Sequence, residues 1–385
     1  MNVKVFGQRS GSAWRIAGSG VERVVSAVRS LLHRDRLEQL PPRDPYLQGV
    51  TASSATITWV EDEHGVGAIE YGETPRLGRE RVDPNIGRRH AVVLTDLEPV
   101  TTYYYRVCGT GGSPVAYRFR TAPAHEDSRF SFAVVGDSGD GGRAQLEVAG
   151  LLGRLRPDLI LHAGDLVYPR GAQKDYDRRF FAPYRALIEE VPVFPVLGNH
   201  DVLHRDGAAF LENFHPPLHS SGSTKRFYSF DWGGAHFVAI DSELYHDDRG
   251  ADPEEQKAFL ERDLAATDKR WKFAFLHRSL HSSSRHGSDE EIRKDLEPLF
   301  AHYSVDVVFS GHDHVYERTV PIKGVTYVVS GGGGRRLYRA GKGRRTACSK
   351  SAHHAVFVHV DGSRLLLEAT KPDENVFDRW ELVRA

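Results

Sequence analysis

The sequence predicts an α/β protein in which a small all-β domain precedes a larger core of strands alternating with helices. Between residues 44 and 122, short alternating polar and apolar runs are separated by Gly, Pro and Asp turns, which is typical of an antiparallel β-sandwich. From residue 129 onward the pattern is different, and apolar strand-like runs are separated by segments with helical periodicity. That alternation indicates an α/β core with parallel pairing, made mixed by hairpins.

Residues 1–43 are expected to form an N-terminal amphipathic helix and a linker. Apolar residues recur at helical spacing from Val21 to Leu32, and the linker is Pro41-Pro42-Arg43-Asp44-Pro45. We expect this helix to pack on its own protein or on a partner, with a membrane-surface helix as the alternative. There is no recognisable signal peptide and no apolar run of transmembrane length. A cytoplasmic location is therefore the default expectation and export is the alternative.

Composition narrows the class of partner. The 385 residues suit two domains, and 51 Lys and Arg nearly cancel 52 Asp and Glu. That balance favours no nucleic-acid or membrane partner, and it leaves an oligomer open. Cys108 and Cys348 are too few for a disulfide framework, so two free thiols are expected.

The β domain is assigned to residues 44–122. The stretch from Leu97 to Arg106 resembles the L-x-P-x-T-x-Y-x-Y-R strand of fibronectin type III-like domains, and a structural role is favoured over binding. Strands are expected at Thr56–Val60, Gly67–Tyr71, His90–Leu94, Thr102–Cys108 and Val115–Thr121.

The larger domain is assigned to residues 128–372. A helix is expected to open at Asp252-Pro253, and Gly233-Gly234 is expected to join a hairpin. Strands are expected at Phe130–Val135, Leu159–Ala163, Val193–Leu197, Arg226–Trp232, Ala235–Asp241, Lys272–Leu276, Val305–Phe309 and Val325–Val329.

Five of these strands end in loops of Gly, Asp, Asn and His. The loops are Gly136-Asp137-Ser138-Gly139, Gly164-Asp165-Leu166-Val167-Tyr168, Gly198-Asn199-His200-Asp201, His277 after Phe275-Leu276, and Gly311-His312-Asp313-His314. Because ligands of open α/β sheets bind outside the carboxyl ends of the strands, we expect these loops to converge. Taken singly, each motif is explained as well by a turn, a helix cap or a structural histidine. Together they supply oxygen and imidazole ligands without thiolate, which suits hard or borderline metals.

This motif set resembles the calcineurin-like metallophosphoesterase superfamily, and Tyr168 in G-D-x-x-Y narrows the resemblance to purple acid phosphatases. The runs Val315-Tyr316-Glu317-Arg318 and Ser330-Gly331-Gly332-Gly333-Gly334 follow as in that family. The resemblance extends from about residue 45 to about residue 370. It implies a metallophosphoesterase core, a β-sandwich flanked by helices, preceded by a fibronectin type III-like β-sandwich as in the larger, plant-type members.

The resemblance also implies a ligand set for two metals. It places Asp137, Tyr168 and His314 on the first metal and Asn199, His277 and His312 on the second, with Asp165 bridging the two. Two carboxylates and a phenolate suit a trivalent ion beside a divalent one. Because tyrosine has an ordinary pKa of about 10, a phenolate at acidic pH requires a strong Lewis acid. The expected metals are Fe(III) at the first site and Zn(II), Fe(II) or Mn(II) at the second.

The implied activity is that of an acid phosphatase, in which a metal-activated hydroxide hydrolyses phosphate monoesters of small phosphorylated substrates. His200 and His286 match the histidines that contact substrate and assist the leaving group. Plant-type members often carry a second histidine after the latter, whereas Gly287 stands here, and His281 is either a substitute or a surface-loop residue. The competing functions are a phosphodiesterase or nucleotidase on the same metal core, and an inactive binding module.

Three further features are expected to be secondary. Asp201 and Asp313 are predicted to hold neighbouring loops. The basic run from Arg335 to Arg345 is predicted to be a solvated loop, with a place at the rim of the site as the alternative.

Overall fold

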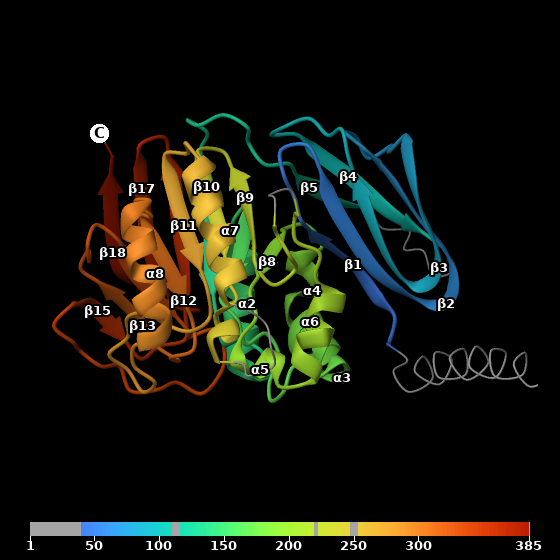
Figure 1. Cartoon of the computed structure of the whole chain (residues 1–385). Coiled ribbons are helices and arrows are strands. Elements are labelled where there is room, and N and C mark those ends of the chain that lie inside the picture. Colours follow the sequence, from blue (N-terminus) through green and yellow to red (C-terminus); the bar gives the residue numbers. More distant parts are fainter. Residues whose placement is uncertain (1–39, 110–115, 219–221, 247–252, 385) are drawn as a thin grey trace, which may run out of the picture. The chain divides into compact units, whose positions relative to one another are not determined.

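The structure is a computed structural model that describes residues 40–109, 116–218, 222–246 and 253–384 (Figure 1). Pro41–Ala385 forms one compact unit. The predicted amphipathic helix lies outside the described residues. None of the helices in the described ranges has the length and apolarity needed to cross a membrane. Cys108 and Cys348 are free thiols, as expected.

The N-terminal domain is the expected fibronectin type III-like sandwich. Its antiparallel strands are β1 (Arg43–Gln48), β2 (Ala55–Gly72), β3 (Arg79–Leu94), β4 (Thr102–Cys108) and β5 (Tyr117–Arg120), in the order β1-β2-β4-β5 with β3 also on β2. Trp59, Tyr103 and Phe119 are buried in its core. The two strands expected at Thr56–Val60 and Gly67–Tyr71 are one strand, β2, because the residues between them continue as an exposed ribbon paired with β3.

The larger domain contains two mixed sheets, as its sequence predicted. One sheet has the order β18-β17-β16-β6-β7-β8 and the other β15-β13-β14-β12-β11-β10-β9. The strands are β6 (Phe130–Val135), β7 (Leu159–His162), β8 (Val193–Pro195), β9 (Tyr228–Trp232), β10 (Ala235–Ala239), β11 (Trp271–Phe275), β12 (Val307–Ser310), β13 (Tyr316–Thr319), β14 (Thr326–Ser330), β15 (Thr346–Lys350), β16 (Ala355–Asp361), β17 (Arg364–Thr370) and β18 (Val376–Val383). The expected hairpin is β9–β10, turning at Gly233 and Gly234.

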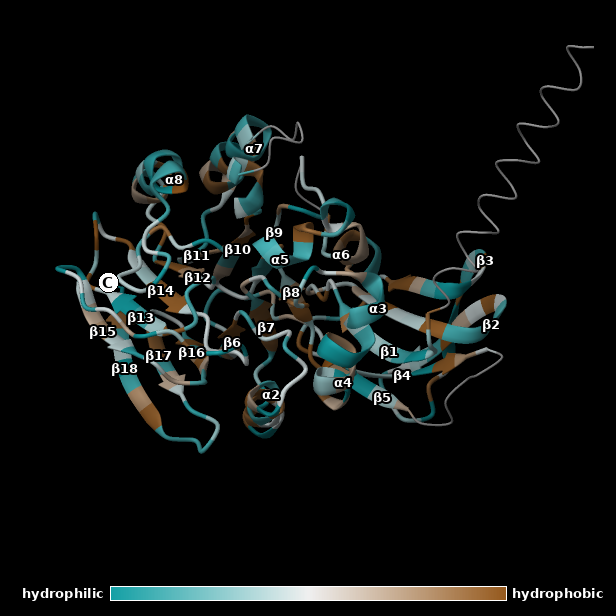
Figure 2. Ribbon diagram, turned by 90° about the horizontal axis from the view of Figure 1, so that it is seen from below, coloured by the Kyte–Doolittle hydropathy of each residue, from teal (hydrophilic) through white to brown (hydrophobic). Residues whose placement is uncertain are grey.

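Helices cover the outer faces of the two sheets. Side chains alternate along each strand, so Phe132 of β6 faces the core between the sheets while Ala133 faces α2 (Arg143–Leu155). In the other sheet, Phe273 of β11 faces the inner core, and Ala274 faces α7 (Pro253–Ala266) and α8 (Glu290–His302). Figure 2 shows α7 and α8 on one side of the strands and α2 on the other. The predicted β-sandwich flanked by helices is confirmed.

Shorter helices lie on the connections. They are α3 (Gln173–Tyr176), η1 (Asp177–Phe181), α4 (Ala182–Ile188), α5 (Asn199–Val202), η2 (Arg205–Gly207), α6 (Ala208–Asn213) and η3 (Ser242–His246).

The C-terminal strands complete the first sheet. β16 pairs antiparallel with β6, and β17 and β18 follow it outward. Because β18 lies beyond residue 372 and pairs along β17, we propose that the larger domain ends at residue 383 rather than 372.

Candidate metal centre

The five motif loops leave the same ends of neighbouring parallel strands. β6, β7 and β8 are parallel in one sheet, and β11 and β12 are parallel in the other. Asp137 and Asp165 follow β6 and β7, Asn199 opens α5 after β8, His277 follows β11, and His312 follows β12. The predicted convergence is therefore present at one edge of the paired sheets.

The backbone is strained where three of these side chains turn inward. Asp137, Asp165 and His312 have φ angles of 56°, 54° and 69°, in the left-handed region that non-glycine residues avoid. Such a conformation costs about 1–3 kcal/mol per residue and persists only where the surroundings impose it. Here the amide of Asp137 donates to the carbonyl of Gly164, and the amide of His312 donates to Oδ2 of Asp137. The strain is typical of a site that must hold side chains in one position.

Three donor atoms form a first cluster. Oη of Tyr168 lies 3.2 Å from Oδ1 of Asp137 and 3.3 Å from Nε2 of His314. The same Nε2 lies 3.4 Å from the Asp137 oxygen, so the three atoms form a nearly equilateral triangle. All three side chains are buried.

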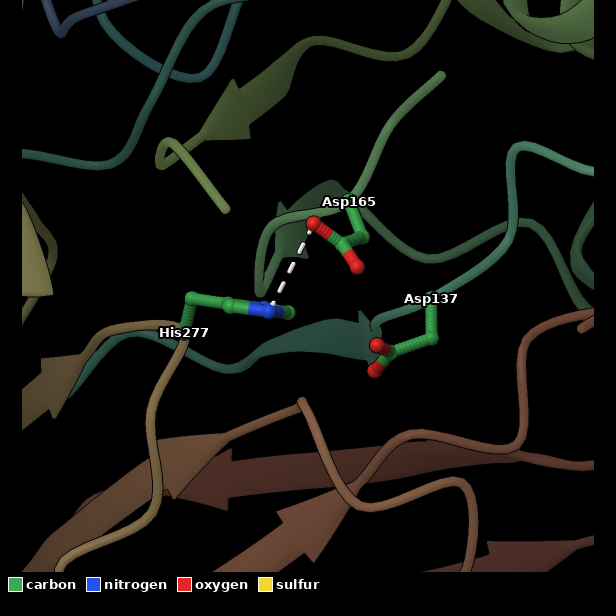
Figure 3. A group of neighbouring side chains, drawn as sticks. All are labelled: Asp137, Asp165 and His277. Atoms are coloured by element: carbon green, nitrogen blue, oxygen red, sulfur yellow. Dashed lines mark ion pairs between the residues drawn. The ribbon is translucent and has the colours of Figure 1, made fainter. Parts of the chain in front are cut away.

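A second cluster surrounds Nε2 of His277. It lies 3.0 Å from Oδ1 of Asn199, 3.2 Å from Nδ1 of His312 and 3.5 Å from Oδ1 of Asp165. The two clusters adjoin, because the ligand atoms of Asp137, Asp165 and His277 all lie within 4.8 Å of one another. Figure 3 shows these three side chains pointing toward a common space, with Asp165 facing His277.

The spacing and chemistry of these donors fit metal ions. Ligands bound to one ion at about 2.1 Å lie about 3.0–3.4 Å from each other. The three distances of the first cluster fall in this range, as do those from Nε2 of His277 to Asn199 and His312, and the distance to Asp165 is 3.5 Å. Nδ1 of His277 lies 2.9 Å from the carbonyl oxygen of Ala163, which fixes the proton on Nδ1 and leaves a lone pair on Nε2. That lone pair faces the carboxylate oxygen of Asp165. Two acceptors facing each other in a buried site are stabilised by a cation between them.

The pKa shifts show that burial disfavours the charged forms of these side chains when no cation is present. Burial raises the pKa of Asp137 to about 6, because the carboxylate has lost its hydration. Burial also lowers the pKa of His277 well below its ordinary value and that of His312 to about 2, so both imidazoles are neutral. The pKa of Tyr168 is raised well above 10 by burial and by the two neighbouring aspartates. Without a cation Tyr168 is therefore a neutral phenol.

Asp201 holds the loops behind the donors, as predicted. Its carboxylate accepts hydrogen bonds from the amides of Leu166, Val167 and Gly198 at 3.0–3.1 Å. These bonds join the loop that carries Asp165 to the turn that carries Asn199. Asp201 therefore fixes the distance between two predicted ligands.

The two predicted substrate histidines each pack against a predicted metal ligand. The ring of His200 packs 4.5 Å from that of Tyr168, and its Nδ1 lies 2.6 Å from the carbonyl oxygen of Pro169. The ring of His286 packs 4.2 Å from that of His312. His281 is not a substitute, because it is buried with Nε2 2.7 Å from Oε2 of Glu297.

The basic run after the glycine cluster reaches the centre at its first residue. The Arg335 guanidinium lies 4.6 Å from the ring centroid of Tyr168 and forms an ion pair with Asp140. Residues 342–345 are exposed. Arg335 therefore lies at the rim of the centre, whereas residues 342–345 form the solvated part of the run.

One residue beside the centre was missed. The ring of Tyr338 stacks on His314 with centroids 4.1 Å apart and planes at 17°, and its Oη lies 3.4 Å from Nε2 of His286. The available signal was an aromatic residue inside the basic run, which local pattern alone does not distinguish from an ordinary loop tyrosine.

Comparison with known proteins places this architecture in a class. The family profile described as calcineurin-like phosphoesterase matches residues 130–316, and the profile described as purple acid phosphatase, N-terminal domain, matches residues 42–121. The larger domain thus matches the calcineurin-like phosphoesterase profile, and the sandwich before it matches the profile of the purple acid phosphatase N-terminal domain. Together the two matches make the chain similar to purple acid phosphatases in both of its domains.

Individual relatives agree with this placement. Purple acid phosphatase 23 of Arabidopsis thaliana is 29% identical over 290 residues, which are 64% of this chain and 62% of that protein. Purple acid phosphatase 15 of the same plant is 31% identical over 294 residues, which are 64% of this chain and 54% of that protein. The chain thus spans less than two thirds of the length of either relative.

A solved structure shows the same fold. The purple acid phosphatase from yellow lupin (Lupinus luteus) seeds superposes with a TM-score of 0.78 at 24% identity. The superposition covers 89% of this chain and 74% of that one.

Proposed function

We propose that this protein hydrolyses phosphate monoesters at a binuclear metal centre. The observation that carries the proposal is the convergence of seven donor side chains from five strand-end loops into two clusters with coordination-like spacing. We assign Asp137, Tyr168 and His314 to the first ion, and Asp165 to a bridge between the ions. The second ion is assigned Asn199, His277 and His312.

The chain's own residues position the ligands and handle protons. Bound ions supply Lewis-acid activation of water and neutralise the phosphate charge. Because Nδ1 of His200 lies against the carbonyl oxygen of Pro169, its Nε2 is left to contact a substrate oxygen. His286 is exposed beside His312, where we propose that it donates a proton to the leaving group.

The first ion is proposed to be Fe(III). Burial holds the pKa of Tyr168 well above 10, so the phenolate forms only beside a strongly polarising cation. Two carboxylates, Asp137 and Asp165, add negative charge that also favours a trivalent ion. The second ion is proposed to be Zn(II), Fe(II) or Mn(II), since the neutral donors Asn199, His277 and His312 suit any of these.

Metal analysis combined with a visible spectrum tests the centre. We expect about two metal ions per chain and a tyrosinate-to-Fe(III) charge-transfer band, as the ligand assignment requires. Tyr168→Phe should abolish the band, while Tyr104→Phe on β4 should leave it unchanged. Protein that is iron-free, colourless and active would contradict the iron assignment but not the phosphoesterase proposal.

A pair of substrates tests the reaction class. The rates for the mono- and bis-ester of one chromogenic phenol should differ in favour of the monoester. Faster hydrolysis of the bis-ester would assign the same centre to a phosphodiesterase. Fully metallated protein without activity on either ester would leave a binding module.

A further inference from the structure

Beyond His286, two side chains continue the rim of the proposed centre. The guanidinium carbon of Arg285 lies 5.0 Å from the ring centroid of Tyr338, within cation–π range. Tyr338 in turn stacks on His314 and brings its hydroxyl to 3.4 Å from His286. A group leaving past His286 would therefore meet Tyr338 and Arg285 next.

The loop that carries Arg285 is held from two sides. The Asp313 carboxylate accepts hydrogen bonds from the amide of His286 at 2.9 Å and the hydroxyl of Ser282 at 2.6 Å. The Glu317 carboxylate accepts from the amide and the hydroxyl of Ser283 at 2.7 and 2.8 Å. Asp313 and Glu317 are both buried. Because both anchors are buried, the backbone at Arg285 is largely set before a ligand binds, and the contact with Tyr338 positions the guanidinium.

Tyr338 is fixed in the same way. Its amide donates to the carbonyl of His314 at 3.1 Å, and its own carbonyl accepts from the hydroxyl of Ser351 at 2.7 Å. The ring therefore offers Arg285 a rigid platform beside the donor cluster.

Arg285 differs from Arg278 and Arg335 in its ion pairs. Arg278 forms a two-point ion pair with Glu243, and Arg335 is paired with Asp140. Within the described ranges, Arg285 has no ion pair with a carboxylate, and it is exposed. Its guanidinium is free to bind a planar oxyanion with two parallel hydrogen bonds.

We propose that Arg285 and Tyr338 form a subsite for a second anionic group, a phosphate or a carboxylate, carried by the leaving group of the substrate. This inference rests on the proposed phosphomonoesterase function and narrows its substrate class. The preferred substrates are then doubly anionic compounds, in which one phosphate lies at the metal centre and the other oxyanion binds Arg285.

Three substrates separate the two kinds of anion. Phenyl phosphate has an uncharged leaving group, carboxyphenyl phosphate adds a carboxylate, and inorganic pyrophosphate adds a phosphate. In Arg285→Gln, kcat/KM for at least one charged substrate should fall about tenfold more than kcat/KM for phenyl phosphate, the loss expected for one charge-assisted hydrogen-bond pair. The substrate that shows the larger relative loss identifies the anion.

Three further variants distinguish a direct contact with the second anion from a general loss of folding or activity. Arg285→Lys should restore part of the lost ratio, because it returns the charge without the planar fork. Tyr338→Phe keeps the ring stack and should cost the charged substrate only about two- to fivefold, since one hydroxyl is lost. Arg76→Gln, at an exposed position of the sandwich, should change none of the ratios.

The outcomes distinguish this inference from the function on which it rests. If Arg285→Gln changes the ratio of charged to uncharged substrate by less than about threefold while phenyl phosphate is still hydrolysed, the subsite is wrong and the phosphatase proposal stands. If the fully metallated wild-type protein hydrolyses none of the three substrates, both are wrong.

Discussion

At the residue scale, buried charges away from the metal centre are compensated by partners on the chain itself. His236 is buried with a carboxylate at each ring nitrogen, Asp231 at 2.7 Å and Asp263 at 2.8 Å. Burial alone would lower the pKa of this histidine. The two carboxylates outweigh burial and raise the pKa to about 9. The imidazolium is therefore the native form at neutral pH.

This raised pKa predicts a pH dependence of stability. Because the folded pKa lies above the ordinary value of 6.5, the stabilisation is complete below about pH 6.5 and is lost as pH rises through about 9. The loss should be on the order of 3 kcal/mol at most, at about 1.4 kcal/mol per pKa unit. Denaturant unfolding of wild type and His236→Gln across this range measures it. Parallel curves for the two proteins would contradict the assignment, since all other titrating groups are shared.

The residues that sequence predicted best are those whose role is set by their loop. Asp137, Asp165 and His277 each follow the end of a strand. The alternation of strands and helices in the sequence is therefore enough to predict that these side chains meet at one edge of the sheets. Arg285 and Tyr338 could not be predicted in this way. Their place beside the centre results from tertiary packing. The ring of Tyr338 stacks on His314, and the guanidinium of Arg285, from another loop, packs on that ring.

At the scale of elements, the loop after β11 and the turn after β12 act as one unit through Asp313. This carboxylate accepts from Ser282, from the amide of His286 and from the amide of Gly287. The flanking histidines have anchors of their own. The His312 amide donates to Asp137, and Nδ1 of His314 lies 2.8 Å from the carbonyl oxygen of Arg336. Asp313 therefore positions the loop of His286 more than it positions the proposed metal ligands His312 and His314.

Because Asp313 holds the loop of His286 while His312 and His314 have separate anchors, the effect of Asp313→Ala can be predicted. The metal content should be retained, while kcat/KM should fall about 10- to 100-fold, because a displacement of about 1 Å of His286 is enough for such a loss. Elemental analysis and steady-state kinetics on the same preparation measure the two effects. Asp373→Ala, at an exposed turn, provides the control. Loss of metal in proportion to activity would assign Asp313 to the ligand shell instead.

The strands were predicted where apolar and polar residues alternate against a core. β4 and β6 have the expected bounds for that reason. The middle of β2 gave no such signal, because both faces of its ribbon with β3 are largely exposed there. No strand after Val329 was predicted individually. The pairing of β16 with β6 joins segments more than two hundred residues apart, which local periodicity cannot specify.

At the scale of the whole compact unit, the sandwich is joined to the larger domain by a buried polar contact at Asn213, the last residue of α6. Its Oδ1 accepts from Nη1 of Arg43 at 3.0 Å, and its carbonyl accepts from the hydroxyl of Tyr46 at 2.9 Å. Its Nδ2 donates to Oε1 of Gln173 at 3.0 Å. Arg43 also donates to Asp177 at 2.8 Å. One side chain thus connects the first strand of the sandwich to two helices of the larger domain.

Removing this connection should uncouple the two domains. Asn213→Ala leaves the buried groups of Arg43 and Gln173 without their partner, which costs about 1–3 kcal/mol for each unsatisfied group. Calorimetry of the wild type should show one transition for residues 41–385, whereas the variant should show a separate, earlier transition of the sandwich. Asn375→Ala, at an exposed position between β17 and β18, should unfold as the wild type does. A single transition of Asn213→Ala at the wild-type temperature would mean that apolar packing alone couples the domains, and that the polar contact sets only their register.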